Sequence, residues 1–307
     1  MDLRQLRYII AVAEERHITR AAERLGMQQP PLSRQIKAIE QEIGVRLFRR
    51  RPRGVELTDA GRAFLDGARA VFATLDSTLE TTRRTARGEQ GRLSVGCTNV
   101  AALNPLVAHI IREFRAALPL VSVTLLEGYS YDLIERIRNN QIDVAFIRTS
   151  VANPEQIVVD LLRNEPEIVV LPSGHALVRG KGGDDMTLSL KDLASETFLV
   201  FGGPRGTLTM QGNALIAACE KAGFSPRVNP VISNSLARLN LVAAGLGISI
   251  VPTSLQRVSI EGIVYRRLKK PTQLTSPLNL VSRRGDTSPV VRQFLRLAKR
   301  MTETFGK

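Results

Sequence analysis

The stretch ITRAAERLGMQQPPLSRQIKAIE, residues 18–40, decides the fold of the first part of the chain. The apolar residues of its first half recur at helical spacing and predict a short helix over residues 19–25. Gly26 follows at once and supplies the left-handed backbone that ends a helix in a tight turn. Pro30 and Pro31 are tolerated only in the first turn of a helix, so a longer helix begins there. A short helix, a glycine turn and a longer helix together form a helix-turn-helix.

The longer helix has one apolar side and one polar side. Leu32, Ile36 and Ile39 recur at the spacing of a buried stripe. In a DNA major groove, glutamine pairs with adenine and arginine with guanine, while serine and lysine suit phosphates or base edges. The alternative is an ordinary three-helix bundle with a solvated polar face. The residues that we predict to contact DNA at this helix and its start are Gln28, Gln29, Pro30, Pro31, Ser33, Arg34 and Lys37.

The segments on either side complete the same small domain. Residues 3–13 repeat leucine and isoleucine at helical spacing, and Asp2 with Gln5 suits an N-terminal capping box. Residues 44–57 flank an arginine-rich centre with apolar residues, which predicts a two-stranded ribbon, or wing. Most charge runs are solvated faces, but a basic tip directly after a helix-turn-helix suits phosphates or the minor groove. The predicted DNA contacts of the wing are Arg50, Arg51 and Arg53.

A long amphipathic helix is predicted after the wing, with Thr58 as its cap. A single helix cannot bury such an apolar stripe alone, which favours pairing with a second copy of the chain. The alternative is a helix that packs on the C-terminal region of its own chain. The stripe consists of Phe64, Ala68, Val71, Phe72, Leu75 and Leu79.

The composition restricts the class of protein. The 307 residues carry a formal net charge of +14, which suits a polyanionic partner such as nucleic acid. The two cysteines and three histidines show neither disulfide framework nor metal-ligand spacing, so we expect no metal and no cofactor. The chain begins directly in an amphipathic helix and has no apolar run long enough to span a bilayer, so we expect a cytoplasmic protein without membrane contact.

From residue 92 onwards, short apolar strands alternate with helices. Such alternation predicts parallel, doubly wound sheets. Two sets of these elements, joined by strands that return near the end of the chain, indicate a two-lobed α/β fold of the periplasmic-binding-protein type. The expected strands cover residues 93–96, 121–126, 144–147, 168–171, 198–201, 228–232, 248–251, 264–268 and 278–281, with helices near 103–117, 130–140, 208–222, 235–244 and 288–304.

Ligands of open α/β sheets bind beyond the carboxyl ends of the strands. Thr98 and Asn99 precede a helix whose free amides would favour an anion. Arg148 could pair with a carboxylate through two hydrogen bonds, and its alternative role is a salt bridge between the lobes. Tyr129 and Phe201 could stack on a ring. The predicted effector-binding residues are Thr98, Asn99, Val100, Tyr129, Ser130, Arg148, Phe201, Gly202 and Gly203.

The first 90 residues resemble the DNA-binding end of LysR-type transcriptional regulators. The resemblance rests on several motifs in the order and spacing of that family, namely Leu6–Glu14, Ala21–Leu25, Gln29–Ile36, Leu47–Arg50 and Leu57–Gly61. Within the family, the chain is most similar to members that sense aromatic-degradation intermediates or small carboxylates. In these relatives an arginine occupies the strand end that matches Arg148. Softer motifs, the best of which is Leu241–Ile248 followed by Val251-Pro252, extend the resemblance to the rest of the chain.

The resemblance implies a domain plan and a set of partners. We expect a winged helix-turn-helix, a linker helix for dimerisation and an effector-binding domain of two lobes. The implied partners are double-stranded promoter DNA, a small organic effector, further copies of the chain in a dimer or tetramer, and RNA polymerase. The domains cover residues 1–58, 59–90 and 91–307, with lobe I formed by 91–161 and 266–307 and lobe II by 162–265.

Three other classes of protein compete with a DNA-binding regulator. An enzyme is disfavoured because the chain lacks a nucleophile elbow, a P-loop and a glycine-rich dinucleotide motif after a strand. A cytoplasmic solute-binding protein would share the C-terminal fold but not the helix-turn-helix. A redox-sensing regulator would use a nearby pair of cysteines, whereas Cys97 and Cys219 fall in different lobes.

Overall fold

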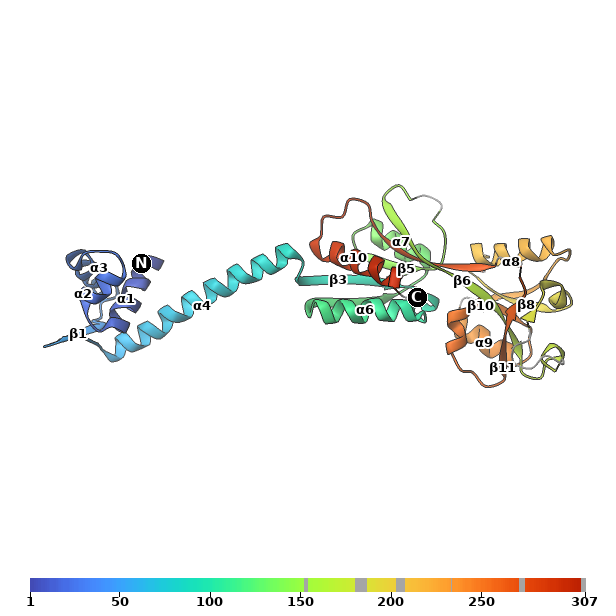
Figure 1. Ribbon diagram of the computed structural model, residues 1–307, viewed down its shortest axis with the longest axis horizontal. Coiled ribbons are helices and arrows are strands. Elements are labelled where there is room, and N and C mark those ends of the chain that lie inside the picture. Colours follow the sequence, from blue (N-terminus) through green and yellow to red (C-terminus); the bar gives the residue numbers. More distant parts are fainter. Residues whose placement is uncertain (152–153, 180–186, 203–207, 233, 271–273, 305–307) are drawn as a thin grey trace. The chain divides into compact units, whose positions relative to one another are not determined.

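The structure is a computed structural model, and it describes residues 1–151, 154–179, 187–202, 208–232, 234–270 and 274–304. The chain divides into two compact units, Met1–Arg84 and Thr85–Lys307 (Figure 1). The predicted fold class is confirmed: a helical head with a wing and a long helix precedes a two-lobed α/β region. No helix among the described residues is both long and apolar enough to cross a membrane.

The head consists of helices α1 (Leu3–Glu15), α2 (Ile18–Arg24) and α3 (Gln29–Ile43). Asp2 caps α1 in a reciprocal capping box with Gln5, as the sequence predicts. Gly26, with φ of +68°, forms the turn between α2 and α3. The buried faces of the three helices meet in one apolar core, formed by Ile9, Ala11, Val12, Ala21, Ala22, Leu32, Ile36 and Ile39 together with Leu47 and Val55 of the wing segment.

The wing is an antiparallel pair of strands, β1 (Phe48–Arg51) and β2 (Gly54–Leu57). It is fixed to the head at its second strand, where the Val55 amide donates to the carbonyl of Arg16 at 2.9 Å. Gly54 has φ of +140°, and a Cβ atom there would lie 2.3 Å from the same carbonyl oxygen. The close approach of the two backbones therefore requires glycine, and it holds the start of β2, next to the turn of the wing, against the end of α1.

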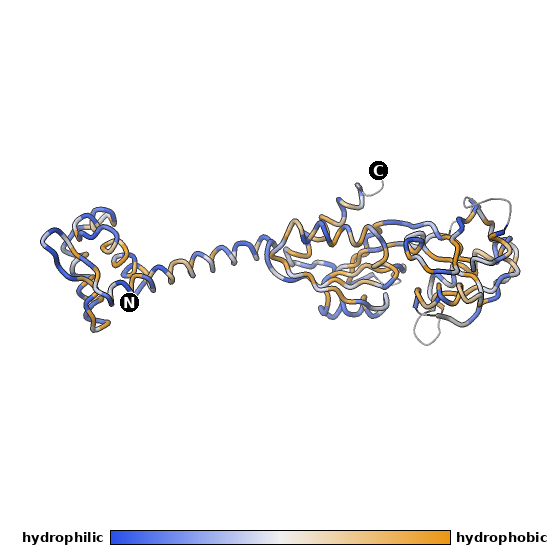
Figure 2. The backbone as a smooth tube through the Cα atoms, turned by 90° about the horizontal axis from the view of Figure 1, so that it is seen from below, coloured by the Kyte–Doolittle hydropathy of each residue, from blue (hydrophilic) through white to orange (hydrophobic). Residues whose placement is uncertain are grey.

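Helix α4 (Asp59–Arg87) is the predicted linker helix. The Thr58 hydroxyl accepts a hydrogen bond from the Gly61 amide at 2.9 Å and so caps its first turn. Only the start of α4 packs on the head, where Leu65 and Ala68 are buried. Further along, apolar residues recur on the helix (Figure 2) but remain uncovered, since Val71 and Leu79 are 44% and 45% exposed.

Lobe I of the second unit is built on a five-stranded part of a mixed sheet. Strand β3 is parallel to β4 and β5, whereas β12 is antiparallel to β5 and to the first part of β6. Helices α6 and α10 pack their apolar faces on this sheet around Phe114, Phe146 and Phe294. The elements are β3 (Gln90–Cys97), α5 (Asn99–Ala102), α6 (Pro105–Ala117), β4 (Leu120–Glu127), α7 (Ser130–Arg138), β5 (Val144–Ile147), β6 (Ile157–Pro172), β12 (Thr275–Arg283) and α10 (Pro289–Thr304).

Lobe II surrounds the second part of β6. Strands β10 and β11 flank this part in antiparallel pairing, while β8 and β9 form a separate parallel pair. Among the residues that the structure describes in this lobe, short 3₁₀ helices cover Ala176–Val178, Leu190–Leu193 and Thr253–Arg257. The remaining elements are β7 (Thr187–Leu188), β8 (Thr197–Phe201), α8 (Met210–Lys221), β9 (Arg227–Ile232), α9 (Ser235–Ala243), β10 (Ser249–Pro252) and β11 (Ile263–Leu268).

Strand β6 differs most from the sequence expectation. The sequence predicts a strand only over residues 168–171, but β6 runs without interruption from Ile157 to Pro172. Its middle is polar, which is typical of a loop in a sequence. Glu165 and Glu167 are nevertheless buried, because partners from other segments satisfy their carboxylates. One strand therefore belongs to both lobes, and it crosses between them at these two glutamates.

Candidate functional site

The first candidate site is the exposed side of α3. Gln28 occupies the N-cap position of α3, and Gln29 and Pro30 begin the helix. These residues are exposed together with Arg34 and Lys37, while Ser33 and Pro31 are half-buried. Neither cation forms an ion pair with any residue in the described part of the chain. The predicted residues thus lie together at the start and on the solvent side of the helix, opposite the buried Leu32, Ile36 and Ile39.

The wing carries arginines of two kinds. Glu56 accepts from Arg49 at 2.9 Å and from Arg51 at 2.7 Å, and these hydrogen bonds lower the pKa of its carboxyl to about 2. Arg51 was predicted to contact DNA, but its guanidinium is bound to this carboxylate in the free protein. Arg50 and Arg53 are exposed and form no ion pair with a described residue, so they are the wing cations available to a phosphate.

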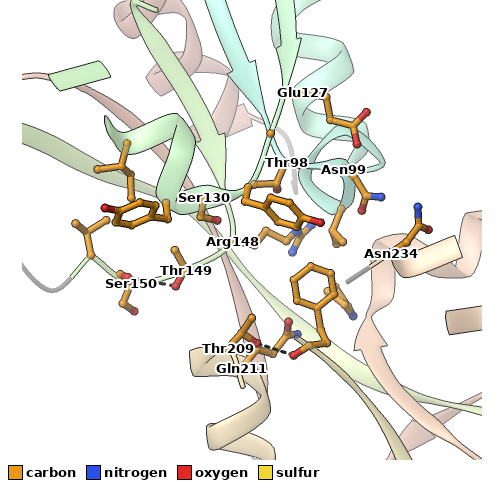
Figure 3. A pocket seen from close by; sticks show the side chains of 18 of the residues that line it. Thr98, Asn99, Glu127, Ser130, Arg148, Thr149, Ser150, Thr209, Gln211 and Asn234 are labelled. Atoms are coloured by element: carbon orange, nitrogen blue, oxygen red, sulfur yellow. Dashed lines mark hydrogen bonds between the residues drawn. The ribbon is translucent and has the colours of Figure 1, made fainter. Parts of the chain in front are cut away.

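The second candidate site is a cavity of about 690 Å³ between the two lobes (Figure 3). Lobe I contributes the ends of β3, β4 and β5, and lobe II contributes β8 and the starts of α8 and α9. Seven of the predicted effector-binding residues line it: Thr98, Asn99, Val100, Tyr129, Ser130, Arg148 and Phe201. Gly202 is not among its described lining residues and instead forms a β-bridge with Leu208, while Gly203 lies outside the described residues.

Arg148 is held by a buried carboxylate. Its guanidinium donates to Glu165, and the two side chains are 6% and 7% exposed. Burial lowers the pKa of Arg148, and the neighbouring Glu165 opposes that shift. Glu165 also accepts from the side chain of Asn104 at 2.8 Å and from the backbone amide of Ser254 at 3.0 Å. The structure therefore shows the salt bridge that the sequence left open as the alternative, and the charge of Arg148 is neutralised before any ligand arrives.

The start of α5 offers less to an anion than the sequence suggests. The expected helix near residues 103–117 is preceded by a separate helix, α5, that contains only four residues. Thr98 uses its hydroxyl to accept from the Ala101 amide at 3.3 Å and so caps this turn itself. A single turn aligns few peptide dipoles, so the positive end of the helix is weak. Thr98 and Asn99 remain lining residues with polar side chains.

Sequence reasoning missed the most buried cation of the cavity. Arg238, one turn into α9, lines the cavity although it is 3% exposed, and its guanidinium lies 5.5 Å from the centroid of the Phe201 ring. Burial lowers its pKa to about 10 and Glu167 opposes this, so the side chain is still a cation at neutral pH. Gln211 and Asn234 also line the cavity and were also missed (Figure 3). The available signal was Asn234-Ser235 opening a helix directly after a strand.

Two family descriptions match the chain and together cover almost all of it. "Bacterial regulatory helix-turn-helix protein, lysR family" matches residues 3–62, and "LysR substrate binding domain" matches residues 86–303. The chain belongs to the LysR family of transcriptional regulators. It is thus a DNA-binding regulator with an effector-binding domain, and members of its family act in transcription rather than in catalysis.

Similar proteins extend over the whole chain of this LysR-type regulator. The HTH-type transcriptional regulator AlsR of Bacillus subtilis (strain 168) is 33% identical over 299 residues, which are 97% of this chain and 95% of the relative. Full-length CbnR complexed with its target DNA has a TM-score of 0.84 at 30% identity, covering 98% of this chain and 100% of that one. The effector-binding domain of BenM with its effector benzoate has a TM-score of 0.61 at 25% identity, covering 70% of this chain and 94% of that one.

The two thiols of this LysR-type regulator are expected to be unreactive in the folded protein. Cys97 and Cys219 are free and buried in separate apolar clusters, and burial raises their pKa values to about 12 and about 11. Because the thiolate is the reactive form, both groups stay protonated at pH 8. Titration with an aromatic disulfide reagent should detect less than one thiol per chain in the native state and two after denaturation. Rapid native-state labelling of either cysteine would revive the redox-sensor alternative.

Proposed function

We propose that this regulator binds a promoter operator through α3 and the wing, and that a small organic anion in the interlobe cavity controls it. The observation that carries the proposal is the exposed polar side of α3, on which Arg34 and Lys37 have no acidic partner within the described residues. Exposed cations beside glutamine and serine suit phosphates and base edges of a major groove. The similarity to CbnR, which has been seen on its target DNA, supports this assignment.

The uncovered stripe of α4 supports assembly of two chains. Val71 and Leu79 are exposed, while Phe72 and Leu75 are only half-buried. A second copy of the helix would cover these side chains, and we propose this pairing as the dimer contact. Two heads related by a two-fold axis would then bind the two halves of a pseudo-palindromic site. A pair of such dimers gives the tetramer that we expect from the family.

Control by the effector requires that the ligand binds two states with different affinity. The cavity is lined from both lobes, so a ligand in it contacts both and favours one degree of closure. Its volume of about 690 Å³ is that of a site for a small molecule. The BenM effector-binding domain, seen with benzoate, supports an organic acid as the class of ligand. We propose that α4 transmits the change in closure to the spacing of the DNA-binding heads.

The salt dependence of DNA binding tests the role of the wing. The full chain should shift a fragment of the promoter next to its own gene, with an affinity that falls steeply as salt rises. Each lost phosphate contact reduces the slope of log affinity against log salt by about 1, so Arg50→Gln with Arg53→Gln should reduce it by about 2 per head. Arg292→Gln, which removes an exposed charge from α10, is the matched control. An unchanged slope in the double variant would remove the wing from the interface, and a wild-type chain without any promoter preference would end the proposal.

A further inference from the structure

We propose that Arg238 at the start of α9 binds the acid group of the effector, and that the effector is a planar organic carboxylate. This inference rests on the proposed function, because it assigns the anchor and ligand class of the same cavity. The sequence pattern assigned the carboxylate contact to Arg148 of lobe I. Arg238, which replaces it in this role, belongs to lobe II and was not singled out by the sequence pattern.

The arginines that line the cavity differ in how their charges are paired. Three arginines do so among the described residues: Arg138, Arg148 and Arg238. The first pairs with Glu135 at 2.6 Å and the second with the buried Glu165. The guanidinium of Arg238 forms neither an ion pair nor a hydrogen bond with a residue that the structure describes, and its buried Nε atom lacks an acceptor. Arg238 is therefore the cation of the cavity whose bonding capacity is unused.

A buried guanidinium without an acceptor is unfavourable in the free protein. Moving a charge out of water is unfavourable unless a counter-charge and hydrogen-bond acceptors replace the lost water. Glu167 is the acidic group that acts on the charge of Arg238, but no ion pair joins the two side chains. The carboxylate of Glu167 instead accepts from Gln211, and burial raises its pKa. The guanidinium lies 5.5 Å from the centroid of the Phe201 ring, which provides no hydrogen-bond acceptor of its own. A carboxylate in the cavity would supply the missing acceptors, and the unfavourable free state would then add to selectivity for anions.

The N-terminus of α9 is a second feature that favours an anion beside Arg238. Asn234, the N-cap residue, lines the cavity, and its side-chain oxygen accepts from the Ala237 amide at 3.0 Å. The first amides of a helix have no acceptor within the helix, and they point toward the space before its first turn. Helix α9 has nine residues, and Arg238 lies one turn from its cap. A carboxylate at this point would meet a helix N-terminus and a guanidinium together.

The rest of the cavity indicates the body of the ligand. Tyr129, Tyr131 and Phe201 place aromatic rings in the lining, and Ile134 and Val151 add aliphatic side chains. Flat rings pack well against aromatic side chains. Since the acid group is directed to Arg238, the remainder of the ligand would extend toward the tyrosines of lobe I. An aromatic or conjugated monocarboxylate fits this arrangement better than a compact inorganic anion.

Calorimetric titration of the full chain tests the anchor. The probes are benzoate, salicylate and phenylacetate, with benzamide as the uncharged match and inorganic phosphate as the compact anion. At least one carboxylate should bind wild type, and benzamide and phosphate should not. Arg238→Met should weaken that binding at least about tenfold, the ratio that corresponds to 1.4 kcal/mol. Arg227→Met, which removes an exposed arginine from β9 in the same lobe, should leave it unchanged.

A second measurement separates binding from a structural role. Arg238→Met removes a buried charge that has no hydrogen-bond acceptor among the described residues, so the ligand-free variant should melt at the same temperature as wild type or higher. A melting temperature lower by several degrees would show that Arg238 holds the fold together and would overturn the inference. Unchanged carboxylate affinity in the variant, equal affinity for benzamide, or binding by none of the three carboxylates would also overturn it. Promoter binding by the wild-type chain without ligand distinguishes these failures from failure of the proposed function, because a chain that still prefers its promoter keeps the proposed function while the anchor is rejected.

Discussion

Replacement of Glu165 by methionine is expected to destabilise the effector-binding unit by about 3–5 kcal/mol, the range found when one partner of a buried ion pair is removed. The variant would leave the Arg148 guanidinium buried without its counter-charge. It would also remove the acceptor of the Asn104 side chain and of the Ser254 amide, each of which is buried. Calorimetric melting of the full chain measures the effect, since the transition of residues 85–307 should move to lower temperature while the head is unaffected.

A double variant shows whether the unpaired charge of Arg148 causes the loss of stability in Glu165→Met. Glu165→Met combined with Arg148→Met removes both charges, and similar exchanges of buried ion pairs for apolar residues are often neutral or stabilising. The double variant should therefore be more stable than either single variant, with a coupling free energy of about 1–3 kcal/mol in the mutant cycle. Additive losses would show that packing, and not the ion pair, makes this position sensitive.

Replacement of Arg34 by alanine is expected to abolish the preference of the regulator for its operator while leaving nonspecific DNA binding nearly intact. A bidentate contact to a base contributes about 1–3 kcal/mol of discrimination, and a dimer loses it at both half-sites, so about 2–6 kcal/mol is at stake. Ser33→Ala should weaken operator binding less, because a neutral hydroxyl lacks the charge and the two parallel donors of a guanidinium. Competition between operator and unrelated DNA at fixed salt measures the effect directly.

The control for this prediction is Arg83→Ala, which removes an exposed arginine from α4 in the same unit. Helical content and melting temperature should be unchanged in all three variants, because Arg34 and Ser33 lie outside the core of the head. If Arg34→Ala retained full operator preference in a folded protein, the contact assigned to α3 would be wrong.

The head could be predicted well because its signals are local. Asp2, Gly26 and Thr58 each act within a few residues of the backbone that they cap or turn, and their roles in the structure are the predicted ones. Secondary structure in the effector-binding unit was predicted nearly as well wherever strands are apolar, as in β3 and β5. The polar middle of β6 was missed, because its burial depends on partners far away in the sequence.

The cavity could be predicted in position but not in chemistry. Seven of the residues predicted from strand ends line the cavity, because parallel strands bring their carboxyl ends to one edge. Whether an arginine at this edge is paired with a carboxylate depends on residues that are distant in the sequence. Nothing near Arg148 in the sequence indicates that Glu165 neutralises its charge. Nothing near Arg238 indicates that this arginine forms no ion pair with any residue in the described part of the chain. Sequence reasoning therefore chose the arginine at a strand end and missed the one that a helix carries.

The continuity of β6 has a mechanical consequence. Glu165 pairs with Ser276 in one ladder and Glu167 with Pro252 in another, so adjoining peptide groups of a single strand are fastened to different lobes. A change in the angle between the lobes must then be taken up as torsion of this strand, which the ladders on both sides resist. We therefore expect this connection between the lobes to be stiff and not freely hinged. The two lobes should then move by small rotations about this strand, among which a ligand that contacts both lobes would select one.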